Sequence, residues 1–167
     1  MREILELLER DARLPHDTIA TMTGIPVAEV SAAVAAWEES RAIRRYKAVV
    51  DWDRVAQQAG ADPTAETVTA FIDVSLAPAR GVGFDDVAER IARFPEVRSV
   101  YLVSGSQDLR CTVDGPTIRA VSDFVSQKLS TLDRVRATAT HFVLKTYKRD
   151  GDAFVAPEPD HRLRITP

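Results

Sequence analysis

The stretch Val97–Asp114, VRSVYLVSGSQDLRCTVD, decides the fold of this chain. Two apolar runs, 97–103 and 109–113, flank Ser-Gly-Ser-Gln-Asp, so the pattern predicts two antiparallel strands joined by a tight turn. Gly105 suits a backbone position with positive φ, and Asp108 can accept hydrogen bonds from nearby backbone N–H groups. A purely structural turn would use the same residues, because Gly and Asp favour turns for conformational reasons.

The segments around this hairpin complete a larger pattern. In chain order they are a strand over Glu66–Leu76, a helix over Phe84–Phe94, the hairpin, a helix over Pro116–Leu129 and a strand around Val135–Tyr147. Asp85 or Asp86 is expected to cap the first helix, with Glu89 completing a capping box after Asp86. The order βαββαβ predicts an α+β, ferredoxin-like domain, with both helices on one face of a four-stranded antiparallel sheet.

The front of the chain has a helical pattern. Short helices are expected over residues 2–10 and near 16–22, and a third begins at Pro26 after the turn Thr23-Gly24-Ile25. This order is the helix-turn-helix signature, whose last helix enters the DNA major groove, although a three-helix packing unit without DNA function fits it too. Ile43–Val50, IRRYKAVV, alternates as a strand that would serve as a wing or hinge.

Length and composition fit two small domains. The chain has 167 residues, 45% of them apolar, and a formal charge of −3, which argues against a nonspecific nucleic-acid coat protein. The expected divisions are a winged helix-turn-helix domain over 1–50, a hinge or linker over 51–65, the ferredoxin-like domain over 66–150, and a tail over 151–167. In the tail, Leu163 and Ile165 suit either a short edge strand or a disordered end.

The sequence predicts a cytoplasmic protein without catalytic or cofactor motifs. Its one cysteine, Cys111, is expected to be a buried, inert thiol, and neither an apolar signal region nor a membrane-spanning run is present. The three histidines are dispersed, and Gly81-Val82-Gly83 lacks the third glycine of a dinucleotide loop. We therefore expect no enzyme, metal, cofactor or membrane partner.

Three parts of the sequence, taken together, resemble the Lrp/AsnC (feast/famine) family of transcriptional regulators. They are ILELLERDARL with TIATMTGI in 4–25, AIRRYKAVVDWDRV in 42–55, and FPEVRSVYLVSGSQD with ATATHFVLKTYK in 94–148. The resemblance implies an N-terminal winged helix-turn-helix and a C-terminal effector-binding domain, assembled as dimers that join into tetramers or octamers. It also implies that small molecules, most often amino acids, bind between dimers near a glycine–aspartate turn.

The resemblance places an effector pocket at this chain's own turn. Gly105 and Asp108 match the glycine and the aspartate, whereas Gln107 stands where the family often has an aromatic residue. Asp108 would pair with a ligand ammonium group, while Ser104, the Gly105 N–H or Thr140 would accommodate a carboxylate. The expected ligand-binding residues are Ser104, Gly105, Gln107, Asp108, Thr138, Thr140 and His141. Ordinary strand packing would explain Thr140 and His141 equally simply.

The expected recognition helix departs from the family in its charge. From Pro26 to Ser40 there is no Lys or Arg, Ala33 occupies the usual arginine position, and Arg41 replaces the glycine that ends the helix. DNA contacts are therefore expected from Arg13, Arg41, Arg44, Arg45 and Lys47 to phosphates, and from Glu29, Ser31 and Ala33 to bases. Two functions stay open: an oligomeric, ligand-responsive regulator that binds double-stranded DNA, or an effector-binding assembly protein that pairs with a related regulator.

Overall fold

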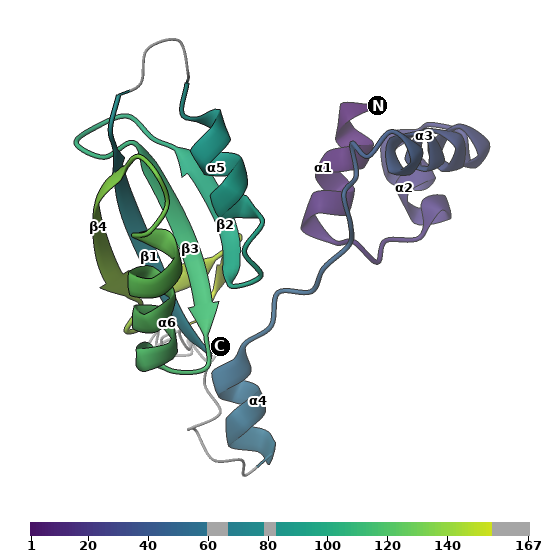
Figure 1. Ribbon diagram of the computed structural model, residues 1–167. Helices are drawn as coiled ribbons and strands as arrows, with labels where there is room; N and C mark the ends of the chain where they lie inside the picture. The colour runs from purple at the N-terminus through teal and green to yellow at the C-terminus, as the bar shows by residue number, and fades with distance from the viewer. Residues whose placement is uncertain (60–66, 79–82, 155–167) are drawn as a thin grey trace, which may run out of the picture. The chain divides into compact units, whose positions relative to one another are not determined.

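The computed structural model describes residues 1–59, 67–78 and 83–154 (Figure 1). The chain divides into two compact units, Met1–Val50 and Asp51–Pro167. The first unit is helical, and the second is built around a four-stranded antiparallel sheet. The α+β class expected from the sequence is therefore confirmed.

Three helices form the first unit: α1 (Arg2–Arg10), α2 (His16–Thr23) and α3 (Val27–Glu39). α2 ends at Gly24, whose left-handed backbone (φ 70°) lets its N–H donate to the Ala20 carbonyl at 2.9 Å. The helices share an apolar core made of Ile4, Leu8, Ile19, Val30 and Val34. Among the described residues no single helix is long and apolar enough to cross a membrane; α2 and α3 pass that test only as a pair bent by 115°.

The end of α3 carries a left-handed residue that is not glycine. Arg41 has a φ of 60°, and after it the N–H of Ile43 donates to the carbonyl of Trp37 at 3.0 Å. A side chain in this conformation costs roughly 1–2 kcal/mol, so the packing around the helix end must offset that cost. Ile43 does pack against the core of the first unit, as does Trp37.

The strand expected over Ile43–Val50 is not formed. Residues 44–50 have no regular secondary structure in the chain as described. An alternating sequence becomes a strand only where a second strand supplies its hydrogen bonds, and this segment belongs to neither of the two sheets that the described residues form. The prediction was wrong for a single chain because the pattern gives the propensity and not the partner.

A helix lies inside the segment expected to be a linker. α4 (Trp52–Ala59) follows Asp51, whose carboxylate accepts a hydrogen bond from the Arg54 N–H at 3.0 Å. An aspartate that binds the N–H three residues later is an N-cap, and this was the local signal that the linker prediction over 51–65 overlooked. Trp52 and Val55 on this helix are exposed.

The sheet of the second unit has the strand order β2-β3-β1-β4. Its strands are β1 (Val68–Leu76), β2 (Val97–Leu102), β3 (Leu109–Gly115) and β4 (Val135–Phe142). The predicted hairpin is present as β2 and β3, with Tyr101 opposite Arg110. β1 lies between β3 and β4, so that Asp73 stands opposite Arg110 on one side and Ala139 on the other.

Helices α5 (Asp85–Ala92) and α6 (Ile118–Phe124) cover one face of the sheet (Figure 1). A π-helical turn, η2 (Val125–Leu129), continues α6. The core between the layers consists of Ala70, Ile72, Val74, Leu76, Val87, Ile91, Leu109, Cys111, Val113, Val121, Phe124 and Leu129. Cys111 is buried as expected, and burial raises the pKa of its thiol to about 12, so the reactive thiolate is scarce at neutral pH.

The two covering helices begin in different ways. Thr117 caps α6, because its hydroxyl accepts a hydrogen bond from a backbone N–H of the first turn at 3.0 Å. The capping box expected for α5 is wrong: Phe84 precedes the helix, and no side chain caps it. Asp86 instead accepts from Arg134 Nη1 at 2.8 Å, so a tertiary ion pair replaces the local cap that Asp85 or Asp86 was expected to supply.

The other face of the sheet, which we call the open face, carries the alternate residues of each strand. They are Thr69, Phe71, Asp73 and Ser75 of β1, Ser99 and Tyr101 of β2, Arg110, Thr112 and Asp114 of β3, and Ala137, Ala139 and His141 of β4. Phe71 is 44% exposed and Tyr101 is 59% exposed, so two aromatic rings lie on this face in contact with solvent.

A short hairpin that the sequence analysis did not predict follows β4. It consists of β5 (Lys148–Arg149) and β6 (Asp152–Ala153), joined by Asp150 and Gly151 with φ of 50° and 95°. An Asp-Gly pair with both φ values positive is the turn that two-stranded hairpins favour. The edge strand considered near Leu163 and Ile165 lies outside the described residues.

Candidate functional site

The turn between β2 and β3 is fastened to β1 by side-chain hydrogen bonds. Asp108 Oδ2 accepts from the N–H of Leu76 at 2.7 Å, and the hydroxyl of Ser75 donates to Gln107 Oε1. Gly105 has a φ of 136°, a conformation that residues with a Cβ rarely adopt. The carboxylate of Asp108 thus faces β1 and holds the turn in place.

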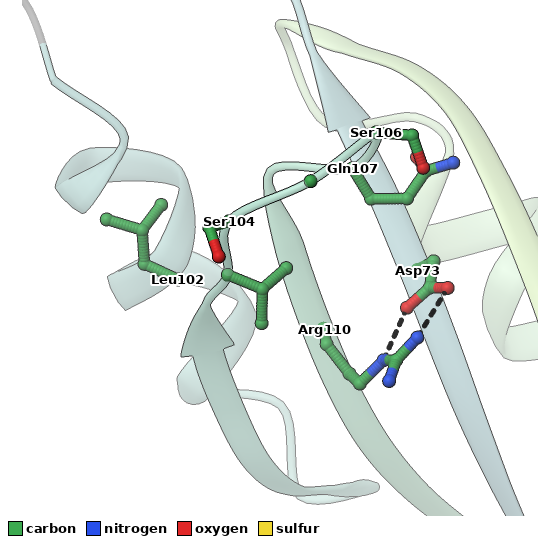
Figure 2. Close-up of a pocket in the computed structure, with 8 residues that line it drawn as sticks. Asp73, Leu102, Ser104, Ser106, Gln107 and Arg110 are labelled. Carbon is green, nitrogen blue, oxygen red and sulfur yellow. Dashed lines mark hydrogen bonds and ion pairs between the residues drawn. The ribbon is translucent and has the colours of Figure 1, made fainter.

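A pocket of about 540 Å³ opens beside this turn (Figure 2). It is lined by Asp73, Leu102, Val103, Ser104, Gly105, Ser106, Gln107 and Arg110. Small-molecule sites typically enclose about 300–1,000 Å³, so the pocket can hold a metabolite. Figure 2 shows the side chains of Asp73 and Arg110 facing each other, with Leu102 on the side remote from this pair.

An ion pair between Asp73 and Arg110 forms one wall of the pocket. Arg110 Nε and Nη2 donate to the two carboxylate oxygens of Asp73 at 2.7 and 2.9 Å. These hydrogen bonds hold the pKa of Asp73 below its usual value against the opposing effect of burial, and the same pair raises the pKa of Arg110. The Asp73 side chain is 10% exposed and that of Arg110 52%, so mainly the positive partner meets solvent.

The pocket contains only some of the expected ligand-binding residues. Ser104, Gly105 and Gln107 are among its lining residues. Asp108 is not among the lining residues, because its carboxylate faces the backbone of β1. The side chain expected to meet a ligand ammonium group is thus already engaged with Leu76.

The three expected residues on β4 are divided between the two faces of the sheet. Thr138 and Thr140 stand opposite Val74 and Ile72, whose side chains are buried under the helices. Residues directly opposite in an antiparallel pair share a face, so both threonines point away from the open face. His141 is on the open face, and its Nε2 lies 3.7 Å from Asp73 Oδ2.

Sequence reasoning missed Asp73, Arg110 and Ser106. Asp73 and Arg110 are charged residues inside strands that are otherwise largely apolar, and this could have marked them as functional or paired. Their meeting depended on the pairing of β1 with β3, which brings together positions 37 residues apart. Nothing local in the sequence indicates that pairing.

The residues expected to read bases on α3 lie in different environments. Glu29 is exposed, whereas Ala33 belongs to the buried class at 9% exposure. Ser31 is half-buried, and its Oγ lies 2.9 Å from Nδ1 of His16 on α2. The exposed positions of α3 are occupied by Val27, Ala28, Glu29, Ala32, Ala35, Ala36, Glu38 and Glu39.

The basic residues expected to meet phosphates, Arg13, Arg41, Arg44, Arg45 and Lys47, are all exposed. Arg41, Arg44, Arg45 and Lys47 lie within residues 41–47, which we call the basic segment. In this segment the hydroxyl of Tyr46 donates to Glu38 Oε1 on α3 at 2.8 Å. Burial, and secondarily Glu38, raises the pKa of Tyr46, so the phenol keeps its proton and can donate at neutral pH. One hydrogen bond thereby connects the basic segment to the candidate recognition helix.

Known proteins that share this architecture are bacterial and archaeal regulators. The family model described as the Lrp/AsnC ligand binding domain matches residues 69–153. The chain is 48% identical over 165 residues to the HTH-type transcriptional regulator YugG of Bacillus subtilis, covering 99% of this chain and 95% of YugG. The HTH-type transcriptional regulator PH0140 of Pyrococcus horikoshii is 29% identical over 154 residues, covering 92% of this chain and 89% of that protein.

Two solved structures from Mycobacterium tuberculosis have the same fold. The leucine response regulatory protein superposes with a TM-score of 0.70 at 24% identity, covering 92% of this chain and 97% of that one. The feast or famine regulatory protein complexed with L-methionine gives 0.68 at 24% identity, covering 92% and 96%. With a family model over half of its length and a relative 48% identical across nearly all of it, this chain belongs to the Lrp/AsnC family of transcriptional regulators and is not an enzyme.

Proposed function

We propose that the protein is an oligomeric, DNA-binding regulator whose activity responds to an amino acid or a similar small metabolite. The observation that carries this proposal is the presence, in one chain, of a three-helix unit followed by an exposed basic segment and of a sheet unit with a metabolite-sized pocket. In this assignment 1–50 is a winged helix-turn-helix domain, 51–65 the connection, 66–150 a ferredoxin-like effector and oligomerisation domain, and 151–167 a tail. We expect it to act in the cytoplasm.

An amino-acid effector is supported by the pocket and by one structural neighbour. The similar feast or famine regulatory protein was solved with L-methionine. In this chain, Ser104, Gly105 and Gln107 of the expected site line a pocket of suitable size. The polar lining favours a small ligand with hydrogen-bonding groups over a purely apolar one.

Oligomerisation is supported by the open face and by the segment after α3. Phe71 and Tyr101 lie exposed on the open face, and a second copy would remove both rings from water. Residues 44–50 alternate as a strand but have no regular secondary structure in the described chain, and pairing with the same segment of a second protomer would make them a strand. We therefore propose at least a dimer, with dimers joining into tetramers or octamers.

The surface of α3 favours a second candidate function. Its exposed side chains are one valine, alanines and glutamates, which supply no positive charge for phosphate contacts. An assembly protein that binds the effector and pairs with a related regulator would not need such contacts. In a DNA-binding protein, the affinity must instead come from the basic segment, multiplied over the copies in the oligomer.

Selection of bound fragments from total genomic DNA, with and without an amino-acid pool, distinguishes the two candidates. We expect wild-type protein to retain fragments, and the variant with Arg44, Arg45 and Lys47 replaced by alanine to bind all of them more weakly. For this variant, the slope of the logarithm of the DNA-binding constant against the logarithm of the salt concentration should be shallower by about one unit for each lost phosphate contact. The variant with Arg93, Arg119 and Arg136 replaced by alanine loses the same charge from the second unit and should bind like wild type. Absence of wild-type binding at about 50 mM salt would leave the assembly function as the explanation.

A further inference from the structure

The side of α3 that faces away from the core of the first unit presents alanine methyl groups. Val30 and Val34, on the opposite side of the helix, are buried in that core. Because an α-helix has about 3.6 residues per turn, Ala28, Ala32 and Ala35 share one face opposite these valines, and all three are exposed. We call these three alanines the outward row.

The polar side chains of α3 add little that could read a base. Ser31 Oγ lies 2.9 Å from Nδ1 of His16 on α2, and Glu38 Oε1 accepts from the hydroxyl of Tyr46 at 2.8 Å. The charged side chains of the helix are all carboxylates, which accept hydrogen bonds and donate none when ionised. Guanine presents two acceptors in the major groove and is typically bound by Arg or Lys, and α3 contains neither.

The basic segment that follows α3 indicates which partner this face would meet. Arg44, Arg45 and Lys47 are exposed, and Tyr46 between them is joined to the helix by its hydrogen bond to Glu38. DNA phosphates would gain from these positive charges, whereas a second apolar helix packed on the alanines would not. Phosphate contacts carry no sequence information themselves, so the bases must be read by the helix.

We propose that the outward row of α3 recognises the C5-methyl groups of thymines in the major groove. Thymine is the one base that presents an apolar group there, and an alanine side chain is a suitable apolar contact for it. Sequence preference then comes from contacts between methyl groups, and affinity comes from the basic segment. This assignment rests on the proposed function, since it names the base chemistry that the DNA-binding unit selects.

The test uses the full chain and one genomic fragment that wild-type protein retains. Copying this fragment with deoxyuridine in place of thymidine removes every C5-methyl group and leaves base pairing and charge unchanged. Each lost methyl contact should weaken binding by about three- to fourfold, so two or more contacts should weaken it by at least about tenfold. The dependence of the binding constant on salt should be the same for both DNAs, because a methyl group carries no charge.

Two glycine variants locate the contact on the helix. Ala32→Gly removes a methyl group from the outward row, so it should reduce the difference in affinity between the thymine and uracil fragments by about three- to fourfold. Ala36→Gly is the matched control, because Ala36 is also exposed on α3 but lies outside the outward row. Both variants lose the same helix propensity, and thermal unfolding checks that they fold alike. The comparison of the two DNAs on wild-type protein needs no variant.

Three outcomes would overturn the inference. If wild-type protein binds the thymine and uracil fragments equally, methyl recognition is refuted while the DNA-binding proposal stands. If Ala36→Gly reduces the uracil effect and Ala32→Gly does not, the methyl contacts do not involve the outward row. If wild-type protein retains no genomic fragment at all, the DNA-binding proposal is itself refuted, and the reading of thymine is refuted with it.

Discussion

Asp108 shows how one carboxylate can be structural in a turn where a ligand contact was expected. Its Oδ2 accepts from the N–H of Leu76, a residue that is 4% exposed. A buried N–H that loses its acceptor costs about 1–3 kcal/mol. We therefore expect Asp108 to affect the pocket only through the position of the turn, so that its removal lowers stability with or without a ligand.

Replacement of Asp108 by alanine should lower the free energy of unfolding by about 1–3 kcal/mol in urea titrations. Asp108→Asn keeps an acceptor oxygen and should lose less. Asp133→Ala is the control. Its side chain is 92% exposed and makes a long, solvent-exposed ion pair with Arg90 at 3.8 Å, so the free energy of unfolding should change by no more than about 0.5 kcal/mol. If Asp108→Ala keeps wild-type stability but no longer responds to ligand, the result contradicts the structural role and supports a direct contact between Asp108 and the ligand.

Among the elements, the connection between α3 and the basic segment that follows it has two unusual features. Arg41 turns the chain with a positive φ, and the hydrogen bond from Tyr46 to Glu38 connects the segment back to the helix. The segment has no regular secondary structure in the described chain, and this hydrogen bond is one restraint on where its basic side chains lie. The geometry of any phosphate contacts then depends on Tyr46.

Tyr46→Phe removes the hydroxyl and keeps the ring, so it should reduce DNA affinity a few-fold. The salt slope should stay close to that of wild type, because every basic residue is still present. Stability should fall by no more than about 1 kcal/mol, since the hydrogen bond is partly exposed. Glu39→Gln is the control, because it removes a negative charge next to Glu38 without touching this hydrogen bond. Fragment binding by Tyr46→Phe at wild-type strength would show that the segment is positioned by other contacts.

At the scale of the whole molecule, the open face sets the expected assembly. Helices cover one face of the sheet, while the other face exposes aromatic rings to solvent. A second copy packed on the open face would cover those rings. Stable interfaces typically remove about 1,200–2,000 Å² from water, a size that a face of four strands can reach.

Light scattering of wild-type protein should give at least twice the chain mass of 18.4 kDa at micromolar concentration. Replacing Phe71 and Tyr101 together by aspartate should shift the mass toward that of one chain, because removing two carboxylates from water between the sheets costs free energy that burying the two rings does not. Ile118→Asp is the matched control, since Ile118 is 57% exposed on α6 at the helix-covered side. A double variant with the wild-type mass would exclude the open face as the dimer contact.

Local patterns in the sequence predicted the elements that depend on local forces. The alternation in 97–114, the glycine at position 105 and the spacing of apolar residues in the helices act over a few neighbours, and the elements they predict are present. The same reasoning failed where a distant group competed. Asp86 was expected to cap α5 but pairs with Arg134, 48 positions away, and the strand expected over 43–50 is not formed in the described chain.

The sequence by itself thus determined the α+β class, the hairpin, the positive φ at Gly105 and the resemblance that led to the family. Only the tertiary structure decided the content of the pocket. The register of β4 on β1 places Thr138 and Thr140 under the helices and His141 on the open face, and a shift of one residue would exchange them. The pairing of β1 with β3 brings Arg110 to Asp73 across 37 positions. Register and pairing arise from the packing of the whole core, so no local stretch of sequence specifies which side chains meet.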